Sequence, residues 1–299
     1  AVNPMLVSGT EAILTQFNRP PRRIVSLVPS LTESLFDLGF GDAVVGITDY
    51  CTQPRGAIEH LPRVGGTRSP RMADIQSLQP DLILANQEEN PRPVIEALAA
   101  SNSLVWLVFP QTVRDVMRLL WALTEIFGSE NASIRLRLLE DALQLAELTS
   151  SETPLRYFCP IWLDEHAGEP WWMTFNAQTY PADLLRILGG QNVFAERARR
   201  YPLEADLGLA DAEPPAERDT RYPRLTTAEI IAADPEVILL PDEPFRFSET
   251  HRQQCYAQFA GTSAVRHRRI FMINGSLITW HGTRLGRALS ELGWLFQPA

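Results

Sequence analysis

The segment Thr279-Trp280-His281-Gly282-Thr283-Arg284 holds side chains that could do chemistry. The imidazole of His281 could coordinate a metal ion, and the guanidinium of Arg284 could pair with a carboxylate or a phosphate. The segment follows an apolar run that predicts a strand, and it would open the last helix of the chain. A histidine stacked beside Trp280 at a capped helix start explains the same residues without a ligand, so both interpretations stand.

Two acidic segments also follow apolar runs. Glu88-Glu89-Asn90 comes after one run and Asp242-Glu243 after another. A solvated loop explains either segment alone, whereas the two together indicate an acidic rim around a ligand site. Pro29 and Ser30 hold the same position after the first apolar run. In an open α/β sheet, ligands bind beyond the carboxyl ends of the strands, where all these residues would lie.

The densest aromatic cluster is Trp171-Trp172-Met-Thr-Phe175-Asn176. Aromatic faces offer a large contact area at a small entropic cost, which suits a flat or macrocyclic ligand. A tryptophan pair that packs a hairpin against the core explains the cluster equally well. Tyr50 and Tyr222 are further candidates for hydrogen bonding to a ligand.

Composition and motifs exclude several classes of protein. The net charge of −9 argues against a large nucleic-acid footprint, and the absence of lysine excludes a Schiff base and a P-loop. The sequence has no dinucleotide-binding glycine motif, no nucleophile elbow and no zinc-protease motif. Its five histidines and three cysteines are scattered without metal-ligand spacing. We therefore expect no catalytic activity and no catalytic cofactor.

Helical and apolar patterns alternate along the first part of the chain. Short apolar runs at residues 24–28, 43–48, 81–85 and 104–109 predict buried strands, separated by segments with helical spacing. Strands that alternate with helices indicate βα units and a mostly parallel sheet. The expected fold class is therefore α/β.

The same pattern occurs twice. Residues 228–240 repeat residues 73–85 as helix, proline, acidic residue and buried strand, and residues 184–189 repeat 35–39 as a helix ended by glycine. Between the copies, residues 112–148 show helical spacing and no strand. We expect an N-terminal extension over 1–21, lobes over 22–111 and 151–299, and a connecting helix over 112–150. One large α/β domain with coincidental repeats is the alternative.

Two further features concern the second half and the start of the chain. Residues 196–224 carry many charges and prolines, which predicts a long insertion in the second lobe. No apolar run is long enough to span a bilayer, and the first residues show no signal-peptide or lipobox pattern. We expect either a cytoplasmic protein or an extracytoplasmic one, periplasmic or membrane-anchored, whose export signal has been removed.

Several of these segments together resemble a known family. Arg23-Ile-Val-Ser-Leu-Val-Pro-Ser-Leu-Thr-Glu33, Val45-Gly-Ile-Thr-Asp-Tyr50, Pro62-Arg-Val-Gly-Gly66 and Leu188-Gly-Gly-Gln-Asn-Val-Phe194 are similar to segments of the class III periplasmic binding proteins. The resemblance covers about residues 22–295, and the pattern is closest to the cobalamin-binding receptors of that family.

The resemblance implies a fold and a function. The fold would be two Rossmann-like α/β lobes joined by a long rigid backbone helix, with a ligand cleft between the lobes. The function would be to capture a metal chelate or macrocycle and to deliver it to the permease of an ABC importer. A corrinoid such as cobalamin is the first expectation, and haem or a ferric siderophore is the alternative. The protein would be a monomer without nucleic-acid partners.

The alternatives depend on different residues. Haem would need an axial ligand, for which Tyr50 and His281 are the candidates, and an anionic siderophore would favour Arg246 and Arg284. An alternative from another class is a chelatase-like enzyme that handles a metal cofactor. Its metal would need Glu88, Glu243 and His281 to converge.

The expected ligand-binding residues combine aromatic area with polar groups. They are Pro29, Ser30, Tyr50, Glu88, Trp172, Phe175, Tyr222, Glu243, Trp280, His281 and Arg284. Cobalamin receptors carry one glutamate on each lobe that pairs with the transporter. The aligned positions here are alanines, and Asp74 and Glu229 follow one residue later. We expect these two carboxylates to mark the transporter-facing surface.

Overall fold

The computed structural model describes residues 6–101, 103–150 and 152–297, and the chain divides into two compact units. The first unit holds the chain up to Leu143 together with Trp280–Gly286, and the second holds Gln144–Thr279 and the chain from Arg287 onward. Residues 1–5 of the expected N-terminal extension, and residues 151 and 298–299 of the expected second lobe, lie outside the described residues.

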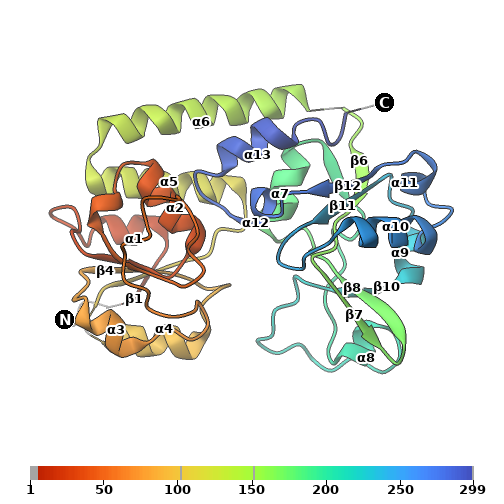
Figure 1. The fold of residues 1–299 in the computed structure, drawn as a ribbon, viewed down its shortest axis with the longest axis horizontal. Helices are drawn as coiled ribbons and strands as arrows, with labels where there is room; N and C mark the ends of the chain where they lie inside the picture. The colour runs from red at the N-terminus through yellow and green to blue at the C-terminus, as the bar shows by residue number, and fades with distance from the viewer. Residues whose placement is uncertain (1–5, 102, 151, 298–299) are drawn as a thin grey trace. The chain divides into compact units, whose positions relative to one another are not determined.

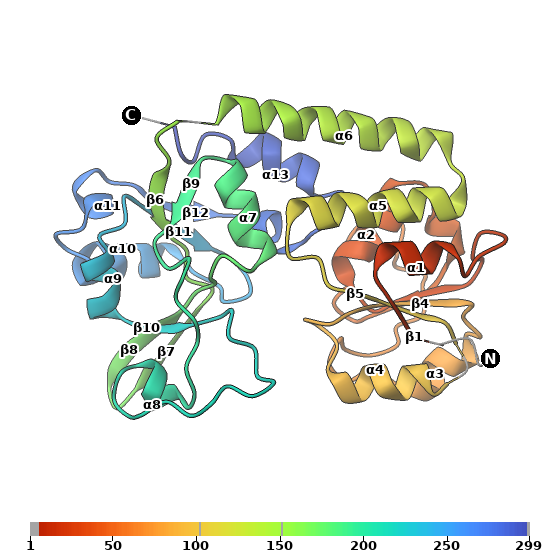
Figure 2. The same cartoon turned by 180° about the vertical axis from the view of Figure 1, so that it is seen from behind.

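The first unit is built on a parallel sheet in the order β1-β5-β4-β2-β3. Its strands are β1 (Leu6–Ser8), β2 (Ile24–Ser26), β3 (Val44–Ile47), β4 (Leu82–Asn86) and β5 (Val105–Val108). The residues of β2 and β4 are buried throughout, as expected for strands covered on both faces. Helices α1 (Thr10–Leu14), α2 (Pro29–Asp37) and α5 (Val113–Phe127) lie on one face, and α3 (Met72–Ser77) and α4 (Arg92–Ala99) on the other (Figure 2).

The expected N-terminal extension is part of this unit. Strand β1 pairs in parallel with β5, with Val7 opposite Trp106, and α1 packs against α5. Val7 and Ile13 are buried, so these residues add an edge strand and a helix to the first lobe. The boundary expected at residue 22 is therefore wrong, because two short elements bury apolar side chains before it.

The expected connecting helix consists of two helices. Helix α5 begins at a capping box, where Thr112 accepts a hydrogen bond from the backbone of Asp115, and it ends at Gly128 with a φ of 62°. Helix α6 (Glu130–Thr149) follows, and the boundary between the units lies inside it, after Leu143. Helix α5 buries most of one face in the first unit and thus belongs to that unit.

The second unit repeats the sheet of the first. Its parallel strands are β6 (Leu155–Phe158), β9 (Gly190–Asn192), β11 (Val237–Pro241) and β12 (Ile270–Ile273), in the order β12-β11-β6-β9. They correspond to β5, β4, β2 and β3 of the first unit. In each unit the first of the four strands along the chain pairs with the second and the third, and the third pairs with the fourth. Helix α9 (Thr227–Ala233) precedes β11 as α3 precedes β4, and the glycines after α2 and after α7 (Tyr180–Ile187) both have positive φ. The predicted repeat is thus confirmed.

A second sheet distinguishes this unit from the first. Strands β7 (Trp162–His166), β8 (Glu169–Met173) and β10 (Arg224–Thr226) form an antiparallel sheet in the order β10-β8-β7 (Figure 1). The predicted insertion lies between β9 and β10 and contains α8 (Leu203–Asp206). Inside it, the fully buried carboxylate of Asp206 binds the guanidinium groups of Arg197 at 2.9 Å and Arg224 at 3.0 Å. The insertion is therefore organised around a polar core.

The remaining elements are helical. They are η1 (Gly41–Ala43) in the first unit, α10 (Glu249–Gln258), α11 (Ser263–Arg266) and α12 (Ser276–Thr279) in the second, and α13 (Leu285–Leu292), which crosses the boundary. Among the described residues, no helix combines the length and the apolar character that crossing a membrane requires.

Candidate functional site

The carboxyl ends of β2 and β4 carry most of the candidate residues of the first unit. Strand β2 leads within two residues into α2, whose first residue is Pro29. Pro29 and Ser30 are buried, and the Ser30 hydroxyl has no hydrogen-bond partner among the described residues. A buried hydroxyl without a partner is costly, so a group that binds here and accepts or donates a hydrogen bond would be favoured.

Arg284 is held by a carboxylate of α2. Its Nε and Nη2 donate to the two carboxylate oxygens of Glu33 at 2.7 and 2.6 Å, and both residues are buried. Its Cζ lies 4.6 Å from the ring centroid of the half-buried Trp280. A bidentate pair of this kind is strong and directional. The expected role of Arg284 as a binder of ligand anions does not fit this geometry, because Glu33 already neutralises it.

The tautomer of His281 follows from its neighbour Asn86. The Oδ1 atom of Asn86 accepts a hydrogen bond from the backbone N–H of Glu88 at 2.7 Å, so its Nδ2 is the atom 3.0 Å from His281 Nε2. An amide nitrogen can only donate, and Nε2 of neutral His281 is therefore the acceptor. Burial lowers the pKa of His281 to about 4, which keeps the ring neutral at pH 7. With the Nε2 lone pair engaged, this geometry argues against metal coordination through Nε2.

The segment around His281 is fixed to α2 by close contacts. Gly282 has a φ of 106°, and a Cβ atom built at this position would lie 2.2 Å from the hydroxyl of Ser34. The next residue, Thr283, donates from its hydroxyl to the Asp37 carboxylate at 2.7 Å and from its backbone to Ser34. Only glycine fits here without a shift of the neighbouring atoms, so the sequence Trp-His-Gly-Thr-Arg is shaped by packing on α2.

The acidic segment after β4 forms a compact turn. Asn90 accepts a hydrogen bond from the backbone of Asn86 and donates to the carbonyl of Thr67. Glu88 is exposed, as expected for a residue that contacts a ligand. Burial, followed by the charge of Glu88, raises the pKa of Glu89 to about 8. The sequence analysis placed both residues in the acidic segment after β4 but named only Glu88 as a ligand-binding residue.

Tyr50 stands at the end of β3 and is 63% exposed. Its ring lies close to the backbone of Gly66, since a Cβ built on that glycine would be 3.3 Å from the ring. A large aromatic ring that remains exposed beyond a parallel strand is available to a ligand. Tyr50 is thus the most accessible of the predicted aromatic residues in this unit.

In the second unit, Trp172 and Phe175 are core residues. Trp172 is 1% exposed; its ring stacks on Phe247 with a centroid distance of 6.2 Å and packs against Phe259 at 5.2 Å. Phe175 is fully buried. The expectation that these two side chains line a ligand site does not fit, because Trp172 on β8 packs in the apolar core of the unit and Phe175, which follows β8, is fully buried.

Tyr222 and Glu243 remain accessible in this unit. Tyr222 is half-buried with the guanidinium of Arg221 5.2 Å from its ring centroid, and Glu243 follows β11 and accepts a hydrogen bond from Thr279 at 3.3 Å. Arg246 is exposed. These residues stay candidates, whereas a metal site is not formed: no group of three metal-ligating side chains lies together in the described part of the chain. Glu243 also belongs to a different unit from Glu88 and His281.

The two expected docking carboxylates occupy the same helical position. Asp74 and Glu229 are each the third residue of their helices, α3 and α9. Asp74 pairs with the Nε of Arg71 at 2.5 Å and is half exposed. Glu229 accepts a hydrogen bond from the backbone of Thr226 at 2.9 Å and so caps its own helix. The repeat makes the positions equivalent, but only Asp74 is free of a capping role.

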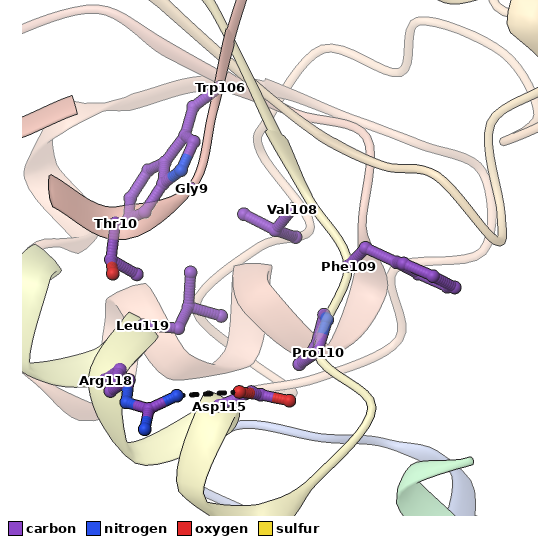
Figure 3. Close-up of a pocket in the computed structure, with 9 residues that line it drawn as sticks. All are labelled: Gly9, Thr10, Trp106, Val108, Phe109, Pro110, Asp115, Arg118 and Leu119. Carbon is purple, nitrogen blue, oxygen red and sulfur yellow. Dashed lines mark hydrogen bonds and ion pairs between the residues drawn. The ribbon is translucent and has the colours of Figure 1, made fainter. Parts of the chain in front are cut away.

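One pocket of the first unit involves none of the predicted residues. It has a volume of about 170 Å³ and lies between α1, β5 and α5, with Trp106, Phe109 and Pro110 on its wall (Figure 3). The Asp115–Arg118 ion pair lies at its edge. Pockets for ligands of drug size usually measure roughly 300–1,000 Å³, so this one is too small for a macrocycle.

The sequence and the fold both match known proteins. A family model described as periplasmic binding protein matches residues 24–277. A vitamin B12-binding protein of Vibrio cholerae serotype O1 is 25% identical over 259 residues, which cover 85% of this chain and 82% of that protein. An uncharacterized ABC transporter substrate-binding lipoprotein of Bacillus subtilis is 22% identical over 305 residues, covering 99% of this chain and 87% of that protein.

Two solved structures illustrate the shared fold. The periplasmic vitamin B12 binding protein of Vibrio cholerae aligns with a TM-score of 0.72 and 22% identity, covering 92% of this chain and 96% of that chain. The apo periplasmic heme-binding protein of Roseiflexus sp. RS-1 aligns with a TM-score of 0.68 and 21% identity, covering 92% and 97%. The expected two-lobed α/β fold is confirmed by these alignments.

Proposed function

The chain belongs to the periplasmic binding protein family, and on that basis we propose that it is the substrate-binding protein of an ABC importer for a corrinoid. It would work outside the cytoplasm, capture its ligand reversibly and pass it to a membrane permease. Binding and release need no chemical step, which agrees with a sequence that carries no catalytic motif. The vitamin B12-binding relatives and the ABC transporter lipoprotein support this assignment.

The hydrogen bond of His281 and the ion pair of Arg284 are the main evidence on which ligand is bound. Haem would need an axial ligand from the protein, and Nε2 of His281 accepts its hydrogen bond from Asn86 instead. An anionic siderophore would need free cations, and Arg284 is neutralised by the buried carboxylate of Glu33. A corrinoid needs neither, because cobalamin brings both axial ligands of its own cobalt and its rim is rich in neutral amides. These two residues therefore favour a corrinoid, whereas haem would depend on Tyr50 and a siderophore on the exposed Arg246.

On the first unit, we propose Ser30, Tyr50, Glu88 and Glu89 as the residues that contact the ligand, next to Pro29. Tyr50 supplies a flat apolar face, and the hydroxyl and carboxyl groups can hydrogen-bond amides. The exposed edge of Trp280 is a further apolar candidate. His281 has a positioning role, since it fixes Asn86 and with it the turn that carries Glu88.

On the second unit, the candidates are Tyr222 and Glu243. Both are partly exposed, whereas Trp172 and Phe175 no longer belong to the proposal because the core buries them. We further propose that Asp74, on its exposed helix, is the main carboxylate for docking to the permease. Glu229 would add less to docking, because one of its carboxylate oxygens caps α9 and the other pairs with Arg197 at 3.4 Å.

Haem remains a second candidate because of Tyr50. A tyrosine oxygen can serve as an axial ligand to haem iron, and this one is 63% exposed. The fold similarity to heme-binding proteins is compatible with this alternative. In that case Tyr50, rather than His281, would hold the iron.

Absorption spectra decide between these ligands. The protein is incubated separately with hydroxocobalamin, cobinamide and haemin, and each sample is desalted. We expect corrinoid colour to stay with the protein at one-to-one stoichiometry and haemin to be lost. Retention of haemin, with a spectrum that changes in Tyr50→Phe but not in His281→Gln, would establish the haem alternative. Retention of none of them would overturn the proposed function.

A further inference from the structure

Helix α6 carries a second apolar face that points to solvent. Ile134, Leu138, Leu145 and Leu148 are between 50% and 76% exposed. The face that packs on the protein carries Ala132, Leu136 and Leu143 instead. The helix therefore carries two apolar faces, and the face formed by Ile134, Leu138, Leu145 and Leu148 is exposed in the described chain.

The exposed residues follow the spacing of a coiled coil. Together with Asp141 they are separated by four, three, four and three residues. At about 100° per residue they fall within an arc of about 80°, and they extend over about 21 Å of the helix axis. Alternating steps of four and three are typical of the a and d positions at which two helices pack. We call these five positions the α6 seam.

In place of the monomer that the family resemblance implies, we propose that the α6 seam is a dimerisation surface that pairs antiparallel with the seam of a second copy of this chain. In the antiparallel register that places Ile134 opposite Leu145 of the second copy, Leu138 falls opposite Asp141. The same register brings the exposed Arg137 within one residue of Asp141 of the other copy, and this happens twice by symmetry. A parallel pair would place like charges opposite each other.

The charges of α6 favour a second copy of the chain, rather than a membrane surface, as the partner of the α6 seam. Within α6, the first half holds Glu130, Arg135 and Arg137 for a net charge of +1, whereas the second half holds Glu140, Asp141 and Glu147 for a net charge of −3. Antiparallel pairing therefore places basic halves against acidic halves. Helices that lie on membranes carry basic polar faces, and α6 has four acidic and two basic residues in a chain of net charge −9. The acidic Asp141 within the seam lowers the affinity and selects the orientation, so the dimer should be weak.

Sedimentation velocity of the full chain from micromolar to millimolar concentration tests the surface. We expect a reversible dimer, weakened at least tenfold by Leu138→Glu and by Leu145→Glu. Leu209→Glu is the matched control: Leu209 is 67% exposed outside α6, so the same change should leave the dimer intact. Circular dichroism melts show that each variant is folded. A monomer at every concentration, or a dimer insensitive to both seam variants, overturns the proposal.

Charge and orientation are tested separately. Arg137→Glu and Asp141→Arg should each weaken self-association, because each places like charges together, and a mixture of the two proteins should dimerise again. Ile134→Cys mixed with Leu145→Cys should form the mixed disulfide upon oxidation, whereas homodisulfides as the main product would overturn the antiparallel arrangement. A monomer that binds vesicles of neutral lipid through α6 would also overturn the proposal. These outcomes do not depend on which ligand the protein carries.

Discussion

The two units share four strands in the same order, but they differ in the segment that comes after the first of these strands. In the first unit β2 runs almost directly into α2, so Pro29, Ser30 and the turn after β4 stay at the strand ends. In the second unit β6 is followed by the strands β7 and β8 before α7. The extra sheet covers this part of the unit and uses its aromatic residues as core. A repeated fold therefore does not repeat a site, because inserted strands decide which side chains remain accessible.

The largest effects should come from breaking the buried contacts of each unit. Glu33→Ala removes the carboxylate that neutralises the buried Arg284 in the first unit and should cost about 3–5 kcal/mol of unfolding free energy. Trp172→Ala opens a cavity in the second unit and should cost a similar amount. Urea unfolding measures both losses. Arg71→Ala is the control, because its exposed pair with Asp74 should contribute less than about 1 kcal/mol. A stable Trp172→Ala protein with lost ligand binding would contradict our assignment of Trp172 to the core.

Acid should destabilise the first unit through His281. Its folded pKa of about 4 lies below the unfolded value of about 6.5, so the unfolded chain binds the proton first as the pH falls. Stability should therefore be complete above pH 6.5 and decrease by about 3 kcal/mol as the pH falls to 4. Melting curves at several pH values measure this slope. His281→Gln should flatten it; an unchanged slope would contradict the buried neutral ring.

Raising the pH should also destabilise the first unit, through Glu89 in the turn after β4. Because the folded pKa of Glu89 is raised to about 8, its unfavourable ionisation in the folded state reduces stability as the pH rises from about 4.5 to 8. Glu89→Gln should remove this loss of stability without changing the loss at acid pH that His281 causes. Melting temperatures across this pH range provide the measurement, and Glu88→Gln serves as the exposed control. Equal responses of the two variants would argue against burial of the Glu89 carboxyl group.

Ligand affinity should separate Tyr50 from Trp172. Tyr50→Ala removes an exposed ring and should leave stability within about 0.5 kcal/mol. Loss of its apolar contact should weaken corrinoid binding about ten- to hundredfold. Titration followed by absorption measures the affinity. Full-strength binding by Tyr50→Ala would remove this residue from the proposed site and shift attention to Tyr222 in the second unit.

The smallest effect on ligand binding should come from the docking carboxylates. Asp74→Arg should leave stability almost unchanged, whereas Glu229→Arg also removes a helix cap and should cost about 0.5–2 kcal/mol. Ligand binding should survive both changes, and delivery to the permease in a transport assay should fail in the double variant. Delivery by the double variant would show that docking uses another surface.

The sequence by itself determined the elements and their repetition. Apolar runs bounded by proline and glycine specified the parallel strands, and the matching helix–proline–strand segments revealed two lobes because each element depends mainly on its own residues. The N-terminal strand escaped prediction, since three residues that pair at a sheet edge show too short a pattern. The capping boxes at Thr112 and Thr226 are equally local, because each depends on two residues three positions apart.

Only the tertiary structure decided which candidate side chains are available. Glu33 and Arg284 are separated by 251 positions, and nothing local shows that they neutralise each other. The tautomer of His281 depends on an amide whose orientation is set by the backbone of Glu88, and the burial of Trp172 depends on Phe247 and Phe259. Residue type specifies what a group can do. Whether the group faces a ligand or an internal partner depends on packing between distant segments, which a local pattern does not encode.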